Sequence, residues 1–232
     1  MFRSLIRSCK NAIAPKGSAF RTLRFGIASG CVIKIDFRDN TGLYFGIYEK
    51  ELEPYLRALL RPGYRCFDVG GQGGYDALVM AKLTNSHVIS MECLPEAAEA
   101  MRDVFARNRF QIQTYECFVG NGEDGSSMSL DVVACETFTP DFIKIDIEGA
   151  EVDALEGARS ILATRKPHLV IEVHGLDKEI ACLKILREYG YEPQTVDPRR
   201  WFKDKRVIEH NRWLICRGRD ETSVGGGVVG AA

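Results

Sequence analysis

A glycine-rich turn is the first group of residues with a clear chemical use. Four glycines fall within positions 70–74, shortly after the acid Asp68. Because glycine has no Cβ, such a turn can bend sharply and let the backbone approach a ligand closely. The dinucleotide fingerprint G-x-G-x-x-G does not fit, because counting from Gly71 its third glycine falls on Asp76. The pattern that fits is Asp-x-Gly-x-x-x-Gly, with its glycines at the two ends of the turn.

A second acid follows 24 residues after Asp68. Glu92 ends the apolar run 88–91, and Cys93 comes next. An acid at the end of a second strand can accept hydrogen bonds from both hydroxyls of a ribose. The ordinary explanation is an exposed glutamate before a helix. Together, the turn and the acid favour a nucleoside-bearing cofactor without a pyrophosphate, which describes S-adenosyl-L-methionine; NAD is the alternative.

The run 141–151, with the sequence DFIKIDIEGAE, carries the third group of charged residues. Side chains alternate along a strand, so Lys144, Asp146 and Glu148 are expected to share one face. Charged side chains in a central strand are costly unless they are paired or turned toward a site. The run therefore predicts the polar floor of a pocket, with a purely structural Lys144–Asp146 network as the alternative.

Glu172 and His174 share a face at the end of the next apolar run. A histidine at this point can act as a general base, with Asp146 as an orienting group. Asp146, Glu148, Glu172 and His174 could converge on Mg or Mn, which prefer oxygen-rich ligands. Their spacing along the chain is not a metal signature, so the sequence predicts no metal.

The elements that must position these residues alternate along the chain. Helices are expected at 75–83 and 95–108, after Gly149, and from a cap at Asp177 to Tyr189. The expected strands are 65–69, 87–91, 113–119, 142–147, 168–173, 191–196 and 213–216. This alternation predicts an α/β fold with a mostly parallel sheet and helices on both faces. Ligands bind such sheets at the carboxyl ends of the strands, where the candidate residues fall.

The overall charge conceals two different regions. The chain has 31 Lys and Arg against 32 Asp and Glu. Residues 1–30 contain six bases and no acid, which leaves 25 bases against 32 acids, a formal balance of −7, for the remainder. Such a leader fits a solvated helix, and equally an organelle transit peptide or a membrane-surface helix. Without a secretory signal or an 18-residue apolar run, we expect a cytoplasmic protein, with organellar or membrane-peripheral placement through residues 1–30 as alternatives.

The composition excludes several protein classes. Hydrophobic residues make up 45% and charged residues 27%, so collagen-like, disordered and multi-span membrane proteins are excluded. The near-zero net charge disfavours a nucleic-acid partner held by bulk charge. None of the eight cysteines forms a C-x-x-C pair, so we expect buried free thiols in a reducing compartment and no structural zinc.

These motifs resemble those of the FkbM family of methyltransferases. The similarity rests on FDVG with Gly74-Tyr75, on Glu92, on FIKIDIEGAE and on IEVH. It covers roughly residues 42–217, because Tyr44, Gly46, Tyr48 and Glu49 also look like the entry segment of the family. It implies a seven-stranded, Rossmann-like class I methyltransferase fold that uses S-adenosyl-L-methionine. It also implies O-methylation of a hydroxyl on a sugar, glycolipid or secondary metabolite. Gln72 and Gly73 depart from the asparagine and aliphatic residue common in the family.

The resulting predictions name a site, its partners and the domain limits. A non-catalytic binding module and an NAD-dependent oxidoreductase are the alternative functions, and base methylation of DNA or RNA is disfavoured because Asp146 stands where such enzymes carry a base-stacking motif. Residues 1–60 are expected to form an extension, 61–217 the methyltransferase domain and 218–232 a flexible tail, and the oligomeric state stays open. The acceptor, a small molecule or carbohydrate, is expected to contact residues 20–60 and 120–140 and the Arg199-Arg200-Trp201 stretch with Lys203. The expected catalytic residues are His174, Asp146, Lys144 and Glu148, and the expected cofactor-binding residues are Asp68, Gly70, Gln72, Gly74, Glu92 and Cys93.

Overall fold

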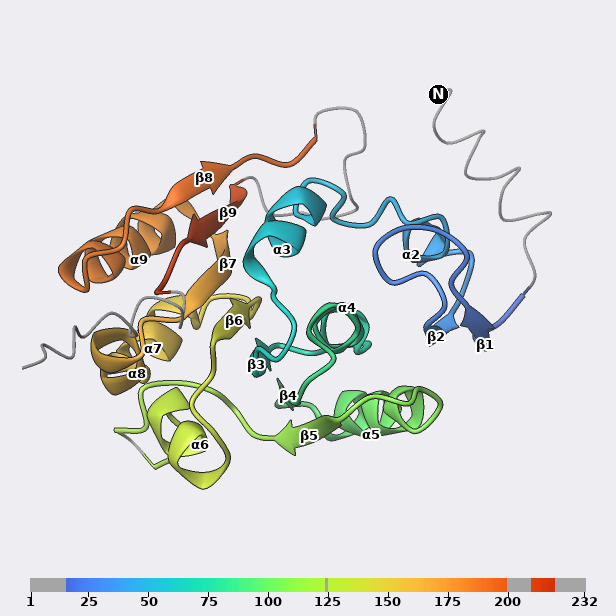
Figure 1. The fold of residues 1–232 in the computed structure, drawn as a ribbon, viewed down its shortest axis with the longest axis horizontal. Coiled ribbons are helices and arrows are strands. Elements are labelled where there is room, and N and C mark those ends of the chain that lie inside the picture. Colours follow the sequence, from blue (N-terminus) through green and yellow to red (C-terminus); the bar gives the residue numbers. More distant parts are fainter. Residues whose placement is uncertain (1–15, 124, 200–209, 220–232) are drawn as a thin grey trace, which may run out of the picture.

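The fold centres on one seven-stranded sheet (Figure 1). The computed structural model describes residues 16–123, 125–199 and 210–219. Strand order is β5-β4-β3-β6-β7-β9-β8; the first five strands run parallel, and β9 runs antiparallel to both of its neighbours. The strands are β3 (Cys66–Val69), β4 (Val88–Glu92), β5 (Ile112–Glu116), β6 (Phe142–Ile145), β7 (His168–His174), β8 (Gln194–Val196) and β9 (Asn211–Cys216). This confirms the predicted mostly parallel α/β sheet.

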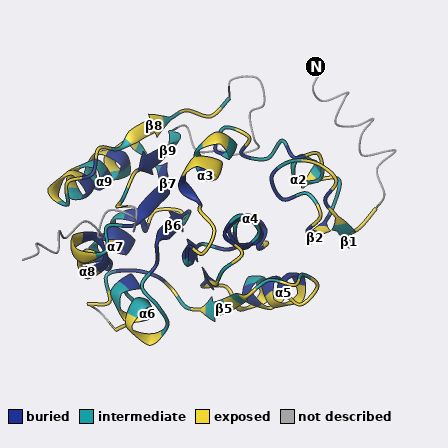
Figure 2. Ribbon diagram, in the orientation of Figure 1, coloured by how far each residue is buried: buried dark blue, intermediate teal, exposed yellow. Residues whose placement is uncertain are grey.

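Helices cover both faces of the sheet because the strand residues alternate between two cores. In β3, Cys66 belongs to the core that contains α4 and α5, whereas Phe67 belongs to the core that contains α6 to α9. Strands β3, β4 and β6 are buried along their full lengths, as Figure 2 shows for the centre of the molecule. The helices are α4 (Tyr75–Thr84), α5 (Pro95–Phe105), α6 (Leu130–Glu136), α7 (Glu151–Glu156), α8 (Arg159–Thr164) and α9 (Leu176–Glu188).

The residues before β3 form an extension that shares the core of α4. It comprises the antiparallel hairpin of β1 (Ala19–Thr22) and β2 (Val32–Ile35), then α2 (Thr41–Tyr44) and α3 (Glu53–Leu59). Several of its apolar side chains, among them those of Ile33 and Leu52, are fully buried in that core. Asn108, just beyond α5, ties β2 to the sheet by hydrogen bonds with the N–H and carbonyl of Val32. This segment therefore forms part of the folded core on the side of the sheet that α4 and α5 cover.

Several predicted helix and strand boundaries need correction: the strands expected at 113–119 and 191–196 are shorter, at Ile112–Glu116 and Gln194–Val196, and the helix expected at 95–108 ends at Phe105. The strand expected at 142–147 ends at Ile145 and gives way to a turn. The single helix expected after Gly149 is divided into α7 and α8 at Gly157, where a Cβ would lie 2.1 Å from the carbonyl oxygen of Gly120. The predicted cap at Asp177 is wrong, because α9 begins at Leu176 with Gly175 as its N-cap and Asp177 within its first turn.

Several sequence expectations concern cysteines, membranes and the chain ends. Of the seven cysteines in the described part of the chain, all are free; Cys31, Cys66, Cys182 and Cys216 are buried, whereas Cys93 and Cys135 are exposed. No helix within the described ranges is long and apolar enough to cross a bilayer. Residues 1–15 of the basic leader, the stretch 200–209 with Trp201 and Lys203, and the tail from 220 lie outside the described residues.

Candidate active site

The glycine-rich turn 70–74 joins β3 to α4 at the carboxyl end of the parallel strands. Gly70 has a φ of +90°, and a Cβ there would lie 2.0 Å from the carbonyl oxygen of Asp146. Its N–H donates to the carbonyl of Met91 at 3.0 Å. Gly74, with a φ of +79°, directly precedes α4. Both glycines of the predicted pattern therefore occupy left-handed backbone positions, and the turn is held between the ends of β4 and β6.

Glu92 connects this turn to the start of α5. It is the last residue of β4 and is buried, and its Oε2 accepts a hydrogen bond from the N–H of Gln72 at 3.0 Å. Its Oε1 accepts another from the N–H of Leu94 at 2.9 Å. Cys93, between these contacts, is exposed. The structure thus brings Glu92 and Gln72 into contact, with Cys93 beside them.

Asp68 belongs to a polar row that crosses the sheet. Thr114, Ser90, Asp68 and Lys144 are aligned in register on β5, β4, β3 and β6. The Ser90 hydroxyl donates to Asp68 Oδ2 at 2.7 Å. Burial raises the pKa of Asp68 to about 6, although the Ser90 hydrogen bond acts to lower it. The row therefore places Asp68, two residues before the glycine turn, next to Lys144 of the KIDIEGAE run.

Lys144 is the centre of a buried charge network. Its side chain is 1% exposed, and its Nζ lies 2.7 Å from Asp76 Oδ2, 3.2 Å from Asp146 Oδ2 and 3.5 Å from Glu49 Oε2. Burial acts to lower the pKa of Lys144, but the three carboxylates together raise it well above its ordinary value. Burial also raises the pKa of Glu49 to about 7. The network thus contains more acids than bases, and Lys144 is firmly cationic.

His174 ends β7 beside a second group of acids. Its Nδ1 lies 2.6 Å from Oε1 of Glu151, which also accepts the His174 backbone N–H at 3.2 Å. Its Nε2 lies 3.5 Å from Glu172 Oε1 and 3.8 Å from Asp146 Oδ1. Burial acts to lower the pKa of His174, but the hydrogen bond to Glu151 and the surrounding acids raise it. The predicted histidine and Asp146 are therefore neighbours.

Glu148 lies beyond the strand that was expected to align it with Lys144 and Asp146. Because β6 ends at Ile145, Glu148 falls in an exposed turn, and its charge helps to raise the pKa of His174. The alternation of side chains thus brings Lys144 and Asp146 together but does not extend to Glu148.

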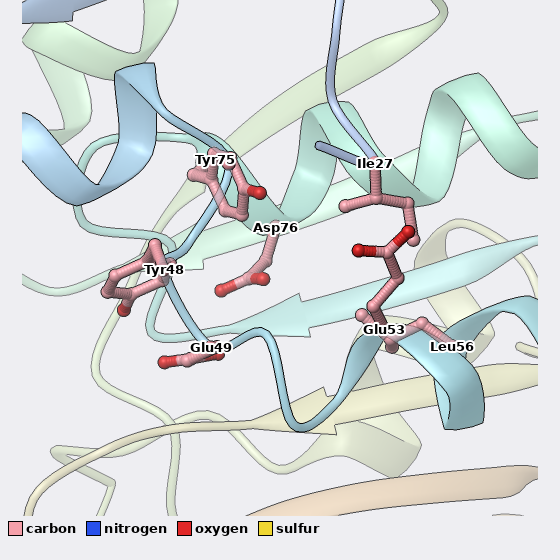
Figure 3. A pocket seen from close by; sticks show the side chains of 8 residues that line it. Ile27, Tyr48, Glu49, Glu53, Leu56, Tyr75 and Asp76 are labelled. Carbon is pink, nitrogen blue, oxygen red and sulfur yellow. The ribbon is translucent and has the colours of Figure 1, made fainter. Parts of the chain in front are cut away.

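A pocket opens next to the Lys144 network, between the extension and α4. In Figure 3, Tyr48, Glu49, Tyr75 and Asp76 surround the hollow. The rings of Tyr48 and Tyr75 meet edge to face with centroids 5.4 Å apart. The remaining lining residues are Ile27, Gly46, Glu53 and Leu56. Because Glu49 and Asp76 also contact Lys144, the pocket lies directly against the charged network.

Arg199 connects the late part of the chain to this extension. Its backbone N–H donates to Glu51 Oε1 and its guanidinium to the carbonyl of Ile47, each at 2.6 Å. The rest of the predicted acceptor-binding stretch, from Arg200 to Lys203, is outside the described residues.

Four residues of the site were not among the predicted site residues, although Glu49 and Glu151 lie in the motifs that carry the family resemblance: Glu49, Asp76, Ser90 and Glu151. Each is the direct partner of a residue that was predicted. Two of them could have been found from their positions in the sequence. Ser90 lies two positions before Glu92 and so on the same strand face, and Asp76 begins the helix directly after the glycine turn.

Comparisons with known proteins agree with the motif assignment. A family model described as a methyltransferase FkbM domain matches residues 118–193. This range includes the KIDIEGAE run and His174, whereas the glycine turn lies before it. No curated protein matches the chain significantly in sequence.

Solved structures share the fold at low sequence identity. A precorrin-6y C5,15-methyltransferase from Geobacter metallireducens is 16% identical with a TM-score of 0.51, over 73% of this chain and 88% of that one. TYW2 from M. jannaschii, solved in complex with AdoMet, is 12% identical with a TM-score of 0.57, over 89% of this chain and 88% of that one. The FkbM methyltransferase from Methylobacillus flagellatus is 20% identical with a TM-score of 0.50, over 73% of this chain; the present chain spans 51% of its length. The resemblance of the sequence to the FkbM family is thereby confirmed over residues 118–193, and the chain shares its Rossmann-like fold with these methyltransferase structures.

Proposed function

We propose that the protein uses S-adenosyl-L-methionine to methylate a hydroxyl group of a sugar, glycolipid or secondary metabolite. The observation that carries this proposal is the contact between Glu92 and the glycine turn at Gln72. It brings a ribose-binding carboxylate and a close-approach backbone to one point, at the carboxyl ends of β3 and β4. The FkbM resemblance supports a hydroxyl as the acceptor.

The residues at this point fit the cofactor. Glu92 accepts one hydrogen bond at each carboxylate oxygen and keeps lone pairs for the two ribose hydroxyls. A Cβ on Gly73 would meet nothing within 4 Å, so the outer side of the turn is open to a ligand. Asp68 would orient the turn or the amino group of the methionine part. Residues proposed to line the cofactor are Asp68, Gly70, Gln72, Gly74, Glu92 and Cys93. When bound, S-adenosyl-L-methionine supplies a methyl group from its sulfonium.

The acceptor would lie on the His174 side of the site. An alcohol is a poor nucleophile, so a base that takes its proton assists the reaction. Glu151 holds Nδ1 of His174, which leaves Nε2 to accept that proton, while Asp146 orients the hydroxyl. Lys144 keeps Asp146 in place, and the exposed Glu148 adds negative charge nearby. Holding the reacting groups in line can contribute roughly 7–11 kcal/mol to the lowering of the barrier.

Calorimetry with S-adenosylhomocysteine tests the cofactor assignment. We expect the wild-type protein to bind, and Glu92→Ala to bind about 10–100-fold more weakly, because hydrogen bonds to a charged group are lost. Glu96→Ala, which removes an exposed acid from the first turn of α5, is the matched control and should bind normally. Absence of binding by the wild type, or equal binding by Glu92→Ala, would reject the assignment.

Mass spectrometry can identify the acceptor. Metabolites from cells with the wild-type protein are compared with those from cells that carry Glu92→Ala. The expected product is present only with the wild type and is heavier than its precursor by one methylene group. A full set of unchanged metabolites, despite cofactor binding, would favour a non-catalytic binding module.

A further inference from the structure

The extension before β3 carries a pair of exposed phenylalanine rings. Phe25, in the loop between β1 and β2, and Phe45, directly after α2, are 52% and 49% exposed. Their rings are stacked, with centroids 6.1 Å apart and planes 19° apart. In Figure 1, α2 and the hairpin of β1 and β2 lie at the opposite end of the molecule from α8 and α9. The two rings therefore form one apolar patch at an end of the molecule, the aromatic pair.

Backbone packing holds the aromatic pair together. Gly26 and Gly46 directly follow the two phenylalanines and have φ angles of +78° and +64°. A Cβ on Gly26 would lie 2.6 Å from Cα of Gly46, and a Cβ on Gly46 would overlap the nitrogen of Gly26. The two loops thus touch backbone to backbone, which residues with side chains would prevent. Two rings kept side by side in water are expected of a binding surface, unlike apolar residues scattered singly over a protein.

The part of the chain that carries Phe25 is strongly basic. Asp36 is the first acid in the sequence, so the first 35 residues contain seven bases and no acid. The remainder has 24 bases against 32 acids, a formal balance of −8. Within the described residues, Lys16, Arg24 and Lys34 are exposed, and Arg24 directly precedes Phe25. An anionic surface would therefore attract this end of the molecule and repel the rest.

The size of the aromatic pair favours a lipid surface over a protein partner. An aromatic side chain buries about 150–250 Å², so two half-exposed rings offer roughly 200 Å². A standard protein interface needs about 800 Å² from each partner. A bilayer requires less contact, because apolar rings enter the boundary between headgroups and acyl chains while basic side chains are attracted to anionic headgroups.

We propose that the aromatic pair inserts into the surface of an anionic lipid bilayer, to which the basic charge of the first 35 residues draws it. Ile27 and Gly46, close to the two rings along the chain, also line the pocket beside the Lys144 network. A bilayer bound at the aromatic pair would therefore lie near that pocket. For methyl transfer, which rests on the proposed function, this arrangement favours a glycolipid as the acceptor. Binding to the bilayer does not itself depend on that function.

The test is sedimentation of the full-length protein with lipid vesicles. We expect binding to vesicles of phosphatidylcholine mixed with phosphatidylglycerol, and much weaker binding to phosphatidylcholine alone or at high salt. Phe25→Ser and Phe45→Ser should each weaken binding about 3–10-fold, because half of a phenyl ring leaves water on insertion. Arg24→Gln should weaken it about 5-fold through the loss of one charge at the surface. Ile180→Ser and Lys184→Gln, at exposed positions of α9, are the matched controls and should bind as the wild type does.

Fluorescence of a Phe45→Trp variant identifies what covers the aromatic pair. In the absence of lipid, iodide should quench the emission that the new indole adds, and anionic vesicles should shift that emission to shorter wavelength. If the indole is shielded before vesicles are added, a second copy or another part of the chain covers the pair, and the proposal is overturned. Equilibrium sedimentation without lipid distinguishes these two cases.

Three further results would overturn the bilayer proposal. These are no sedimentation of the wild type with anionic vesicles, equal sedimentation of the wild type and both serine variants, and binding to single-stranded RNA but not to vesicles. Thermal denaturation checks that each variant is folded, and because the three substituted side chains are exposed, any one folded variant decides the outcome. Binding of S-adenosylhomocysteine is measured in parallel. A wild type that binds vesicles but not S-adenosylhomocysteine would leave the bilayer proposal standing and reject the proposed function.

Discussion

The two halves of the candidate site hold their buried carboxylates in different ways. On the β3–β4 side, Asp68 and Glu92 accept hydrogen bonds from neutral donors: the Ser90 hydroxyl and the backbone N–H groups of Gln72 and Leu94. On the β6–β7 side, the carboxylates lie next to basic side chains, although Glu172 also accepts hydrogen bonds from the neutral donors of Asn211 and Trp213. Lys144 contacts three of them, and His174 lies 2.6–3.8 Å from one of these, Asp146, and from two others, Glu151 and Glu172.

This difference indicates what each half can bind. Neutral donors fix the position of a carboxylate without forming an ion pair, and the attraction of Lys144 does not outweigh the effect of burial on Asp68. Under the proposed function, this side would hold the cationic sulfonium cofactor. On the β6–β7 side, each charge depends on its partners, because a buried ion left alone is far less stable than the pair. Substitutions on the β6–β7 side, where basic groups lie next to the acids, should therefore reduce the free energy of unfolding more than substitutions on the β3–β4 side, where the donors are neutral.

Lys144→Met is the substitution expected to have the largest effect. It leaves Glu49, Asp76 and Asp146 around a site without its cation, and removing one partner of a buried ion pair costs about 3–5 kcal/mol. Urea denaturation of the variant and of the exposed control Lys184→Met measures the difference in unfolding free energy. A loss below about 1 kcal/mol, the usual size for surface pairs, would show that the charges of this half are not interdependent.

Gly70→Ala tests the backbone of the glycine turn on the β3–β4 side. Its left-handed conformation costs about 1–3 kcal/mol for a residue with a side chain, and the new Cβ would lie 2.0 Å from the Asp146 carbonyl. Gly73→Ala is the matched control, because its Cβ would meet nothing within 4 Å and its φ is not positive. We expect thermal denaturation to show a lower melting temperature for Gly70→Ala, with weaker S-adenosylhomocysteine binding. Equal stability of the two variants would contradict the described turn.

The parallel strands, and the order in which they carry the candidate site residues, were predictable because each strand is marked by residues that are close together in the sequence. Buried parallel strands appear in sequence as short apolar runs, and the turns beside Gly70 and Gly149 mark their ends. The division between α7 and α8 was not predictable, because it depends on the approach of Gly157 to the distant Gly120 carbonyl. For the same reason β1 and its pairing with β2 were not predicted: the apolar residues of this hairpin are buried by α4 and α5, far along the chain.

The two halves of the site also differed in how much of them the sequence revealed. Gly70 and Glu92 could be paired because the carboxyl ends of neighbouring parallel strands meet at one edge of a sheet. The partners of Lys144 and His174 could not be identified from the sequence. The position of Glu49 depends on how the extension packs, and that of Glu151 depends on which face of α7 is turned toward His174. Strand alternation predicted the contact of Lys144 with Asp146 but failed for Glu148, which lies beyond the end of β6.

Ser90→Ala is expected to have the smallest effect, and that effect should depend on pH. Ser90 donates to the buried Asp68, whose pKa is raised to about 6 by burial and would rise further without this hydrogen bond. An acid whose pKa is raised on folding favours the folded state in its protonated form. The stability contributed by Asp68 is therefore greatest below its unfolded pKa of about 4 and declines as the pH rises through about 6.

The cost of Ser90→Ala should follow the ionisation of Asp68. Above about pH 7, where Asp68 is ionised, the variant loses a hydrogen bond to a charged group, worth roughly 1.5–3 kcal/mol. Below about pH 5 the carboxyl is neutral, and the loss should fall to about 0.5–1.5 kcal/mol. Denaturation of wild type, Ser90→Ala and the exposed control Ser160→Ala at a series of pH values measures this difference. A cost that is the same at every pH would mean that Asp68 does not change its charge in this range. Asp68 could then not be the carboxylate whose ionisation the β3–β4 side uses to attract a cation.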